Sequence, residues 1–533
     1  MLAFKDVGRL ATSAGYTGLT LVTALATSPL DAQRPTRDWA LEDRVVIGAF
    51  SRITSVAATS DRVYATSPSA LLVWRPQFAR WEGPFVPPEP RLLEGVTMAL
   101  ADPLDNSLWL AGRTGWVNFS PDLQLWTVGE APAPIRGIAF DMSSPDGLLL
   151  DTGQGWLRAN RGSSAVIPAE PPSQPIRPAT MSEVARTHPS LQTGGGLLVD
   201  PRLRDVRYTS AAQSFDRLGW YLGTDGAGLL YLREGSAFPE RLSFGLVGDR
   251  IGALFSAPGG VWVANDLEPN VPAALTFVAA DLSEFRSVYG PPATGLPFGR
   301  VRQLIGIGLE LWAATDQGVA RIQPQTGRTD IFDERRGLPD SRAYALAARR
   351  EWIAAGTARG AARISDSAEV IRIAPDFAGP AYAVGISADT TWIGTDAGLF
   401  FTVSRGGPML QPAALAASQR FRGPVIGMEW MGERLVALTR ERLIWRGERG
   451  VWTAGPDQTA ALGPLRAFVL DGDGAWLAGE RGVGYARFDA PVGRILPVGD
   501  IPAPPVDLAL DADHLWVGTT AGLVRFRLDA LGR

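Results

Sequence analysis

One short motif recurs along this chain and limits its fold more than any other feature. Apolar residues surround a tryptophan, small residues ending in Gly or Thr follow, and a glycine-containing turn leads into a second apolar segment. The step between tryptophans is 40 residues from Trp312 to Trp352 and on to Trp392, and 40 again from Trp476 to Trp516. A period near 40 is typical of the four-stranded blade of a β-propeller.

The repeat covers most of the chain. Its clear copies contain Trp109, Trp220, Trp262, Trp312, Trp352, Trp392, Trp476 and Trp516. Weaker copies without the tryptophan lie at residues 63–66, 148–151 and 435–438. The sequence therefore predicts an all-β fold of about 11 units. We interpret the tryptophans as a structural signature that fills the gaps between neighbouring blades.

The unit around Trp312 shows how four strands fit into one repeat. We expect strands at 301–307, 311–315, 319–322 and 329–332, because apolar segments of strand length alternate there with turn residues. The Thr-x-x-Gly step between the second and third strands indicates a tight hairpin in which Gly318 takes a positive φ. Helical patterns are nearly absent, apart from short segments at 181–186 and 413–419.

These residues resemble the two-component regulator propeller repeat, whose core reads Leu-Trp-Ile-Gly-Thr-x-x-Gly-Leu-x-Arg-Phe. Residues 515–526 match that core almost throughout, and the Gly-Leu-Pro at 337–339 resembles the start of such repeats. In that family the propeller is commonly the periplasmic sensing part of a membrane-bound histidine kinase. The present sequence ends at Arg533, directly after the last repeat and without the kinase modules. We therefore expect no signalling by phosphotransfer from this sequence itself.

Eleven units exceed the usual four to eight blades of one ring, so we predict two rings. We place the first at 33–300 and the second at 301–533, with the seam in the Pro- and Gly-rich segment 290–300. The last unit stops after its third strand, and residues 44–47 have the pattern of the missing fourth strand. Pairing of these segments would interlock the rings through the two termini. An insertion at 160–215 is either a solvent-facing decoration or a functional loop.

The N-terminal segment has the layout of an export signal. Residues 10–30 carry no charge, follow Lys5 and Arg9, and contain Ala24-x-Ala26. Two readings of residues 1–32 remain open, a cleaved signal peptide and a retained membrane anchor. We expect the segment 10–30 to enter or cross a membrane, with the propeller on the periplasmic side.

Composition excludes several kinds of chemistry. The chain has no Cys, and its two histidines are His188 and His514, so neither thiolate catalysis nor a multi-histidine metal site is available. The single lysine, Lys5, lies in the export signal. A net charge of −4 gives no reason to expect nucleic-acid binding. We predict no catalytic, cofactor-binding or metal-binding residues.

The recurring aspartates of the repeat have a structural explanation. Asp225, Asp316 and Asp396 fall in expected hairpin turns, where Asp forms local hydrogen bonds. We therefore do not interpret them as metal ligands.

The function that this pattern favours is that of a non-catalytic, exported interaction or scaffold protein. We expect its partners to be other protein subunits of a membrane-associated complex, for instance a respiratory or photosynthetic one. Two alternatives remain open: a periplasmic ligand sensor that acts with a separate kinase, and a propeller hydrolase or lyase with an unrecognised site.

Overall fold

The computed structural model describes residues 43–189, 191, 197–199, 205–268, 271–288, 296–349, 352–387, 389–403, 407–418, 421–447 and 450–531. The export-signal prediction for residues 1–32 lies outside these residues. More than half of the residues are in strands and few are in helices, which confirms the all-β fold class. The described residues form eleven antiparallel sheets, mostly of four strands.

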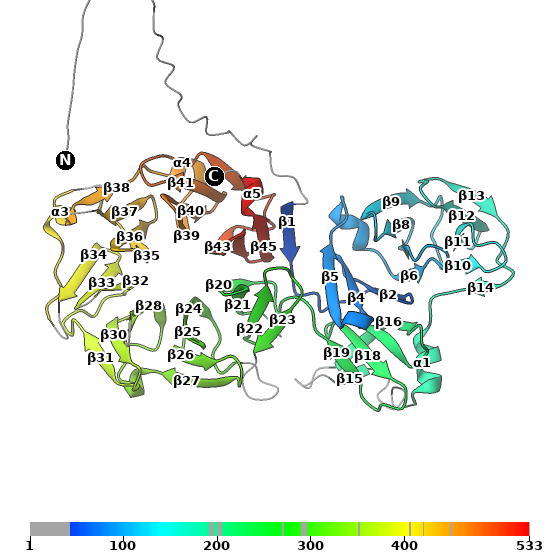
Figure 1. The fold of residues 1–533 in the computed structure, drawn as a ribbon, viewed down its shortest axis with the longest axis horizontal. Helices are drawn as coiled ribbons and strands as arrows, with labels where there is room; N and C mark the ends of the chain where they lie inside the picture. The colour runs from blue at the N-terminus through cyan, green and yellow to red at the C-terminus, as the bar shows by residue number, and fades with distance from the viewer. Residues whose placement is uncertain are drawn as a thin grey trace, which may run out of the picture.

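Seven of the sheets form a closed ring, seen on the left of Figure 1. Their innermost strands β20, β24, β28, β32, β35, β39 and β43 contact one another in that order, and β43 contacts β20 again. We call this body the seven-sheet ring. Its strands are β20 Ile251–Ala257, β21 Gly260–Asn265, β22 Leu275–Ala279, β23 Phe285–Val288, β24 Val301–Ile307, β25 Glu310–Thr315, β26 Gly318–Gln323, β27 Arg328–Phe332, β28 Ala343–Arg349, β29 Trp352–Thr357, β30 Gly360–Ser365, β31 Val370–Ile373, β32 Ala383–Ile386, β33 Thr390–Thr395, β34 Gly398–Val403, β35 Val425–Met431, β36 Arg434–Thr439, β37 Leu443–Arg446, β38 Trp452–Ala454, β39 Leu465–Asp471, β40 Gly474–Gly479, β41 Gly482–Arg487, β42 Arg494–Pro497, β43 Pro505–Leu510, β44 His514–Thr519, β45 Gly522–Arg527 and β1 Arg44–Ile47.

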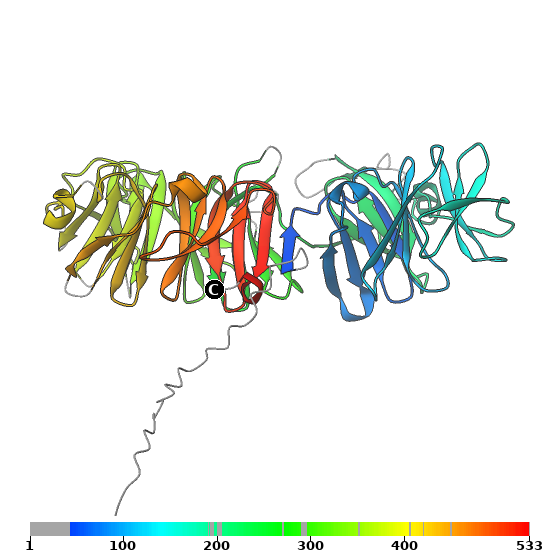
Figure 2. The same ribbon diagram turned by 90° about the horizontal axis from the view of Figure 1, so that it is seen from above.

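The other four sheets form a second body, on the right of Figure 1, which we call the four-sheet body. Its strands are β2 Ser55–Ala58, β3 Val63–Thr66, β4 Leu71–Arg75, β5 Arg80–Phe85, β6 Met98–Ala101, β7 Leu108–Ala111, β8 Gly115–Ser120, β9 Leu125–Glu130, β10 Gly137–Asp141, β11 Gly147–Asp151, β12 Trp156–Asn160, β13 Val166–Ala169, β14 Pro175–Ile176, β15 Leu197–Val199, β16 Asp205–Gln213, β17 Gly219–Thr224, β18 Leu229–Arg233 and β19 Glu240–Leu242. Short helices complete the chain: η2 Pro76–Phe78, η3 Pro90–Leu93, α1 Met181–Thr187, η4 Glu334–Arg336, α3 Ala413–Ala416, α4 Thr459–Leu462 and α5 Leu528–Leu531. Seen from above, the two bodies lie side by side along the long axis (Figure 2).

Local turn chemistry fixes the hairpins of the repeat. The Thr315 hydroxyl donates to the Gly318 carbonyl at 2.7 Å, and the same Thr-to-Gly bond recurs at Thr357, Thr395 and Thr519. Gly318 has a φ of 128°, which strongly favours glycine at that position. The four strands predicted around Trp312 agree with β24 to β27 within one residue at each end.

The two ends of the described chain meet in one sheet. β1 pairs antiparallel with β45, with Val46 opposite Val524, so the N-terminal strand supplies the fourth strand of the last sheet. This is the pairing that the pattern of residues 44–47 predicted. Ile47 is fully buried in the core that the two bodies share.

The predicted seam between the two propeller regions is wrong. The sheet β20–β23 belongs to the seven-sheet ring, because β20 contacts both β24 and β43. The chain instead crosses between the bodies twice, through residues 48–54 and 243–250, and the Leu246 amide donates to the Gly48 carbonyl across the two crossings. The boundary at residue 300 was misplaced because the Pro- and Gly-rich segment 290–300 connects two blades of one ring.

An aromatic cluster joins the two bodies. Phe244, in the second crossing, lies 5.0 Å from Trp81 of the four-sheet body and 4.4 Å from Phe285 of the seven-sheet ring, measured between ring centroids. Phe50, in the first crossing, stacks on Phe244 at 5.6 Å. Because these buried rings belong to one continuous apolar core, the two bodies are packed against each other.

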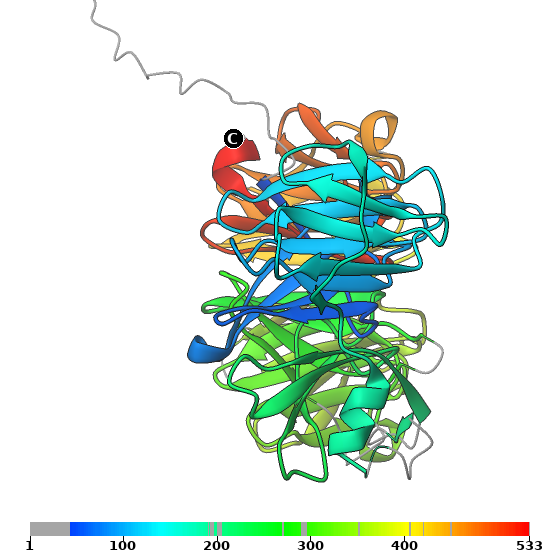
Figure 3. The same ribbon diagram turned by 90° about the vertical axis from the view of Figure 1, so that its right-hand side faces the viewer.

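The four-sheet body uses the insertion to complete its circle. Its inner strands contact in the order β16, β2, β6, β10, and between β10 and β16 the chain inserts residues 175–187, which we call the strap. In the strap, Ile176 pairs with Phe140 of β10, Ala179 forms a bridge with Ala211 of β16, and α1 packs on β16. Figure 3 views this body end-on. The insertion is therefore a structural part of the body, and its predicted helix corresponds to α1.

Candidate functional site

Most signature tryptophans occupy one equivalent position. Trp312 is the third residue of its strand, lies opposite Ile305 of the inner strand and packs in a core shared with the following sheet. The same position in the second strand is taken by Trp262, Trp392, Trp476 and Trp516 in the seven-sheet ring and, counted from the hairpin, by Trp109 in the four-sheet body. All six of these side chains are buried. They account for the packing between neighbouring sheets.

Two signature tryptophans depart from that position. Trp352 begins β29, opposite Arg349, so Ala354 takes the equivalent place and Trp352 is only half-buried. Trp220 lies one residue before the equivalent position. That position belongs to Tyr221, which precedes the turn residue Thr224 by three residues, as Trp312 precedes Thr315. The interpretation that every signature tryptophan fills the gap between neighbouring blades is therefore wrong for Trp352. The position of the hairpin turn, and not that of the tryptophan, marks the equivalent residues of the units.

Three of the buried indoles each form a hydrogen bond with an aspartate, and the repeat analysis did not predict these bonds. The indole N–H groups donate to Asp102 from Trp109 at 3.1 Å, to Asp471 from Trp476 at 3.1 Å and to Asp511 from Trp516 at 2.7 Å. The recurring Asp-x-x-x-x-Trp at 471–476 and 511–516 could have indicated this bond from the sequence.

The two histidines lie outside the ring axis. His514 begins β44 and its Nδ1 lies 3.1 Å from Asp511, at the edge of its sheet. His188 caps the C-terminal end of α1, where its backbone N–H donates to the Val184 carbonyl. Neither side chain lines the channel described next.

A polar cavity, which we call the channel, lies at the centre of the seven-sheet ring. Its volume is about 190 Å³, and residues of all seven inner strands, or the residues just before them, line it. At six inner strands the pairing shifts around the second residue, which is the mark of a β-bulge. The residues at these positions, and their counterpart before β32, are Gly252, Arg302, Tyr344, Tyr382, Ile426, Arg466 and Val506.

At one end of the channel, which we call its mouth, arginine and tyrosine side chains lie on neighbouring strands. The Arg302 guanidinium lies 5.2 Å from the Tyr344 ring, which in turn lies 5.4 Å from the Tyr382 ring. Arg466 is exposed and pairs with Glu480 at 3.1 Å. Repeat analysis missed this ring of positions, although five of the seven lie ten residues before the signature tryptophan of their sheet, as Arg302 does before Trp312.

Two carboxyl groups lie deeper in the channel. Asp507 accepts the backbone N–H of Leu254 at 2.8 Å, and Glu429 accepts that of Leu470 at 3.2 Å, each across to a neighbouring sheet. Burial raises the pKa of Asp507 to about 6 and that of Glu429 to about 7. Both groups therefore change charge between mildly acidic and neutral pH.

Within the described residues, no three His, Asp or Glu side chains are gathered so as to hold a metal ion. None of the helices in the described part of the chain has the length and apolar character needed to span a membrane.

The four-sheet body exposes apolar side chains at the turns of one face. Phe78, Leu104, Leu123, Met142, Phe215, Leu218 and Phe238 lie in turns that join first to second or third to fourth strands, and 53–83% of each residue's surface is accessible. We call these residues the apolar turn face. The corresponding turns of the seven-sheet ring expose Leu309 and Val451 among their described large apolar residues.

These turns lie on the same side of the body. The Arg62 side chain in the β2–β3 turn pairs with Asp122 of the β8–β9 turn at 2.7 Å, and the Tyr64 hydroxyl donates to the Asn106 carbonyl of the β6–β7 turn at 2.9 Å. The fourth sheet is placed by a hydrogen bond from the Ile53 backbone N–H, just before β2, to the Thr224 carbonyl at the end of β17. Since β17 runs antiparallel to β16, the start of β2 lies beside the start of β16, and the two strands run in the same direction. The turns after both strands therefore open on one face.

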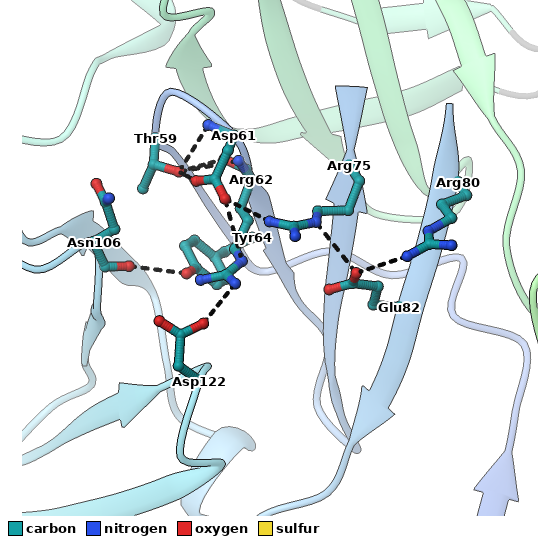
Figure 4. A network of polar contacts seen from close by, with 9 residues as sticks. All are labelled: Thr59, Asp61, Arg62, Tyr64, Arg75, Arg80, Glu82, Asn106 and Asp122. Atoms are coloured by element: carbon teal, nitrogen blue, oxygen red, sulfur yellow. Dashed lines mark hydrogen bonds and ion pairs between the residues drawn. The ribbon is translucent and has the colours of Figure 1, made fainter. Parts of the chain in front are cut away.

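A polar network holds part of this face in place (Figure 4). Asp61 bonds Thr59 and Arg75, and Glu82 pairs with Arg75 at 3.2 Å and with Arg80 at 3.6 Å. Burial raises the pKa of Tyr64 to about 12, so its hydroxyl stays protonated and keeps donating to the Asn106 carbonyl. The turns that carry Phe78, Leu104 and Leu123 are thus tied to their neighbours.

Comparison with known proteins finds similarity in structure alone. No protein-family model matches the chain, and no curated protein matches it by sequence. Among solved structures, the chain is similar to the extracellular domain of a hybrid two-component system from B. thetaiotaomicron, with 13% identity and a TM-score of 0.42 over 89% of this chain and 64% of that one. The sequence resemblance pointed to the same class of protein.

Two further structures are similar at the same level. PorZ, a bacterial surface component of the type-IX secretion system of Porphyromonas gingivalis, matches with 13% identity and a TM-score of 0.43 over 90% of this chain and 69% of its own. Virginiamycin B lyase from Staphylococcus aureus matches with 13% identity and a TM-score of 0.42 over 52% of this chain and 95% of its own. The chain spans 64% of the length of the first of these three structures.

Proposed function

We propose that this chain is an exported, non-catalytic β-propeller that acts as an interaction subunit and binds a partner protein through the apolar turn face. The observation that carries the proposal is that seven large apolar side chains are exposed in turns on one face of one body. Contiguous apolar surface rimmed by polar groups is typical of protein–protein interfaces, and aromatic residues dominate their binding energy.

The surroundings of these side chains support the proposal. Arg80 lies 5.4 Å from the Phe78 ring, and the ion pairs of Arg62 and Arg75 supply polar groups beside the apolar turns. Because the network of Figure 4 already fixes part of the face, binding would lose little conformational entropy there. The partner we expect is another exported subunit of a membrane-associated assembly, with an apolar contact patch of its own.

Site-specific crosslinking in the protein's own cells tests this proposal. A photo-crosslinking phenylalanine analogue at Phe215 or Phe238 should capture one discrete protein. The matched control is the same analogue at Leu309, an equally exposed turn position of the seven-sheet ring. The double variant Phe215→Ser/Phe238→Ser should lose that protein on co-purification while its unfolding midpoint stays unchanged. Equal crosslinking from Leu309, or none from either phenylalanine position, would contradict the proposal.

A ligand sensor is the second candidate, and the channel mouth is the observation that favours it. Arg302, Tyr344 and Tyr382 place a cation and two phenols beside one opening, with Asp507 and Glu429 below. A sensor of this kind should show a saturable thermal shift with small polar molecules that the variant Arg302→Gln/Tyr344→Phe abolishes. The hydrolase or lyase alternative lacks comparable support, because both channel carboxyls are bound to backbone N–H groups.

A further inference from the structure

The four-sheet body contains a second cavity, which is open to solvent and larger than the channel of the seven-sheet ring. Its volume is about 570 Å³, within the range of roughly 300 to 1,000 Å³ typical of small-molecule sites. The ends of β2, β6 and β16 form three of its walls, and the strap forms the remaining one. Seven of the 17 residues that line it are alanine: Ala57, Ala58, Ala99, Ala101, Ala179, Ala211 and Ala212.

The strap explains why this space exists. It lies between β10 and β16, so those inner strands are joined through inserted backbone and not by direct packing. On the three inner strands this space is lined mainly by alanines, which add little side-chain volume to it. The cavity therefore follows from the way this body closes.

The strap wall is firmly built. Thr180 and Glu183 form a capping box at the start of α1, in which the Glu183 carboxylate accepts the Thr180 amide at 2.7 Å. Val184 of α1 is fully buried in a core that contains Trp220 and Leu222. Trp220 also lines the cavity, so an aromatic ring forms part of the wall. The departure of Trp220 from the repeat register has brought its indole to this side of its sheet.

The charged groups of the cavity favour an anion. Arg177 and Arg186 line it and remain exposed to solvent, so they stand where the cavity meets water. Glu183 also lines it, but its carboxylate is engaged in the capping box and lies 3.9 Å from Arg186. One guanidinium, that of Arg177, is thus left without a carboxylate partner among the cavity-lining residues.

We propose that this cavity binds a small molecule with an apolar body and one anionic group. The apolar body lies between the alanine walls and the Trp220 ring, and the anionic group pairs with Arg177 where the cavity meets solvent. The alanines, Trp220 and the other apolar lining residues supply apolar contact in a lining that also contains polar groups, and the arginine fixes the orientation of the ligand. The residues that line this site differ from those of the apolar turn face, and its function does not depend on a protein partner.

Binding of sodium dodecanoate to the full chain tests the proposal, with dodecanol and dodecylamine as matched probes. Equilibrium dialysis should show one dodecanoate per chain, and the intrinsic fluorescence change that accompanies binding should disappear in Trp220→Phe. Arg177→Gln should weaken dodecanoate binding about tenfold and leave dodecanol binding unchanged. Ala179→Leu should abolish binding of both, because the larger side chain reduces the space at the strap.

If Ala179→Leu fails to fold, Ala101→Leu on another wall of the cavity provides the same test. Ala397→Leu, in an exposed turn, is the control and should bind dodecanoate normally. Dodecanoate binding that survives both wall substitutions would place the ligand elsewhere and overturn the proposal. The absence of saturable binding would overturn it as well. Equal affinity for dodecanoate and dodecylamine would overturn the assignment of an anionic ligand. Binding should be unaffected by Phe215→Ser/Phe238→Ser, which separates this result from the test of the turn face.

Discussion

The two bodies are built from the same repeat but close in different ways, and the difference decides what each can hold. In the seven-sheet ring every inner strand contacts the next, and β1 completes the last sheet. In the four-sheet body the circle is completed by the strap, through β14, one isolated bridge and α1. The body with fewer sheets has the larger axial cavity, about 570 Å³ against about 190 Å³. The number of sheets alone therefore does not set the axial space.

Side-chain size explains why the body with fewer sheets has the larger axial cavity. Arg302, Tyr344, Tyr382 and Arg466 occupy the mouth of the wider ring, whereas alanines line the narrower body. The outer surfaces differ as well, because large apolar residues gather on the turns of the four-sheet body. The seven-sheet ring therefore has the more complete closure, and the four-sheet body carries the features suited to binding.

The largest effect should come from removing the strand that closes the seven-sheet ring. A chain that begins at Ala49 lacks β1 and with it the fully buried Ile47, so its free energy of unfolding should fall by more than about 4 kcal/mol. A chain that begins at Asp43 is the matched control. Ile176→Ala in the half-buried strap should cost no more than about 2 kcal/mol. Denaturant titration followed by circular dichroism measures both, and equal losses would remove the distinction between the two kinds of closure.

A smaller effect should separate the tryptophans of the repeat. Trp312→Ala and Trp516→Ala delete side chains buried between sheets, and each should lower the free energy of unfolding by about 3 to 5 kcal/mol. Trp352→Ala should cost about 1 to 2 kcal/mol, because this side chain begins its strand and is half-buried. The same denaturant titrations provide the measurement. A cost at Trp352 equal to that at Trp312 would show that the two positions are equivalent after all.

The smallest effect concerns pH and the channel carboxyls. The folded chain holds the pKa of Glu429 at about 7, above its ordinary value of 4.5, so between these pH values the folded state binds more protons than the unfolded state. This group therefore makes stability fall as pH rises from about 4.5 to about 7. Glu429→Gln should remove that part of the pH dependence, whereas Glu433→Gln in an exposed turn should not. Melting temperatures measured across this pH range decide the matter, and parallel profiles for wild type and Glu429→Gln would contradict the assignment.

Much of the fold could be predicted because the responsible interactions are local. The alternation of apolar residues around Trp312 and the Thr315 to Gly318 turn are contained within about 30 residues, and they predicted four strands in the right places. The apolar pattern of residues 44–47 likewise lies within a few residues, and it predicted the fourth strand of the last sheet. The register of Trp220 and Trp352 was misread because the tryptophan was used as the reference in place of the turn threonine.

The candidate sites depended on contacts that no local pattern contains. The apolar turn face includes residues of different sheets, from Phe78 to Phe238. Whether such a phenylalanine is exposed depends on which other segments pack against its turn in the folded chain. The channel mouth has a regular sequence offset, but its meaning appears only when bulges on different strands face one axis.

The sequence by itself determined the repeat, the strand order within each blade and the strand that closes the last sheet, because backbone pairing and turn conformation follow from residues close together in the chain. The tertiary structure alone decided the division into seven sheets and four, the strap and the cavity beside it. Ring closure joins strands as far apart in sequence as β20 and β43, and it depends on how every intervening sheet packs and twists against its neighbours. That cumulative geometry has no local signal, which is why the seam, the cavity and the exposed face emerged only from the folded chain.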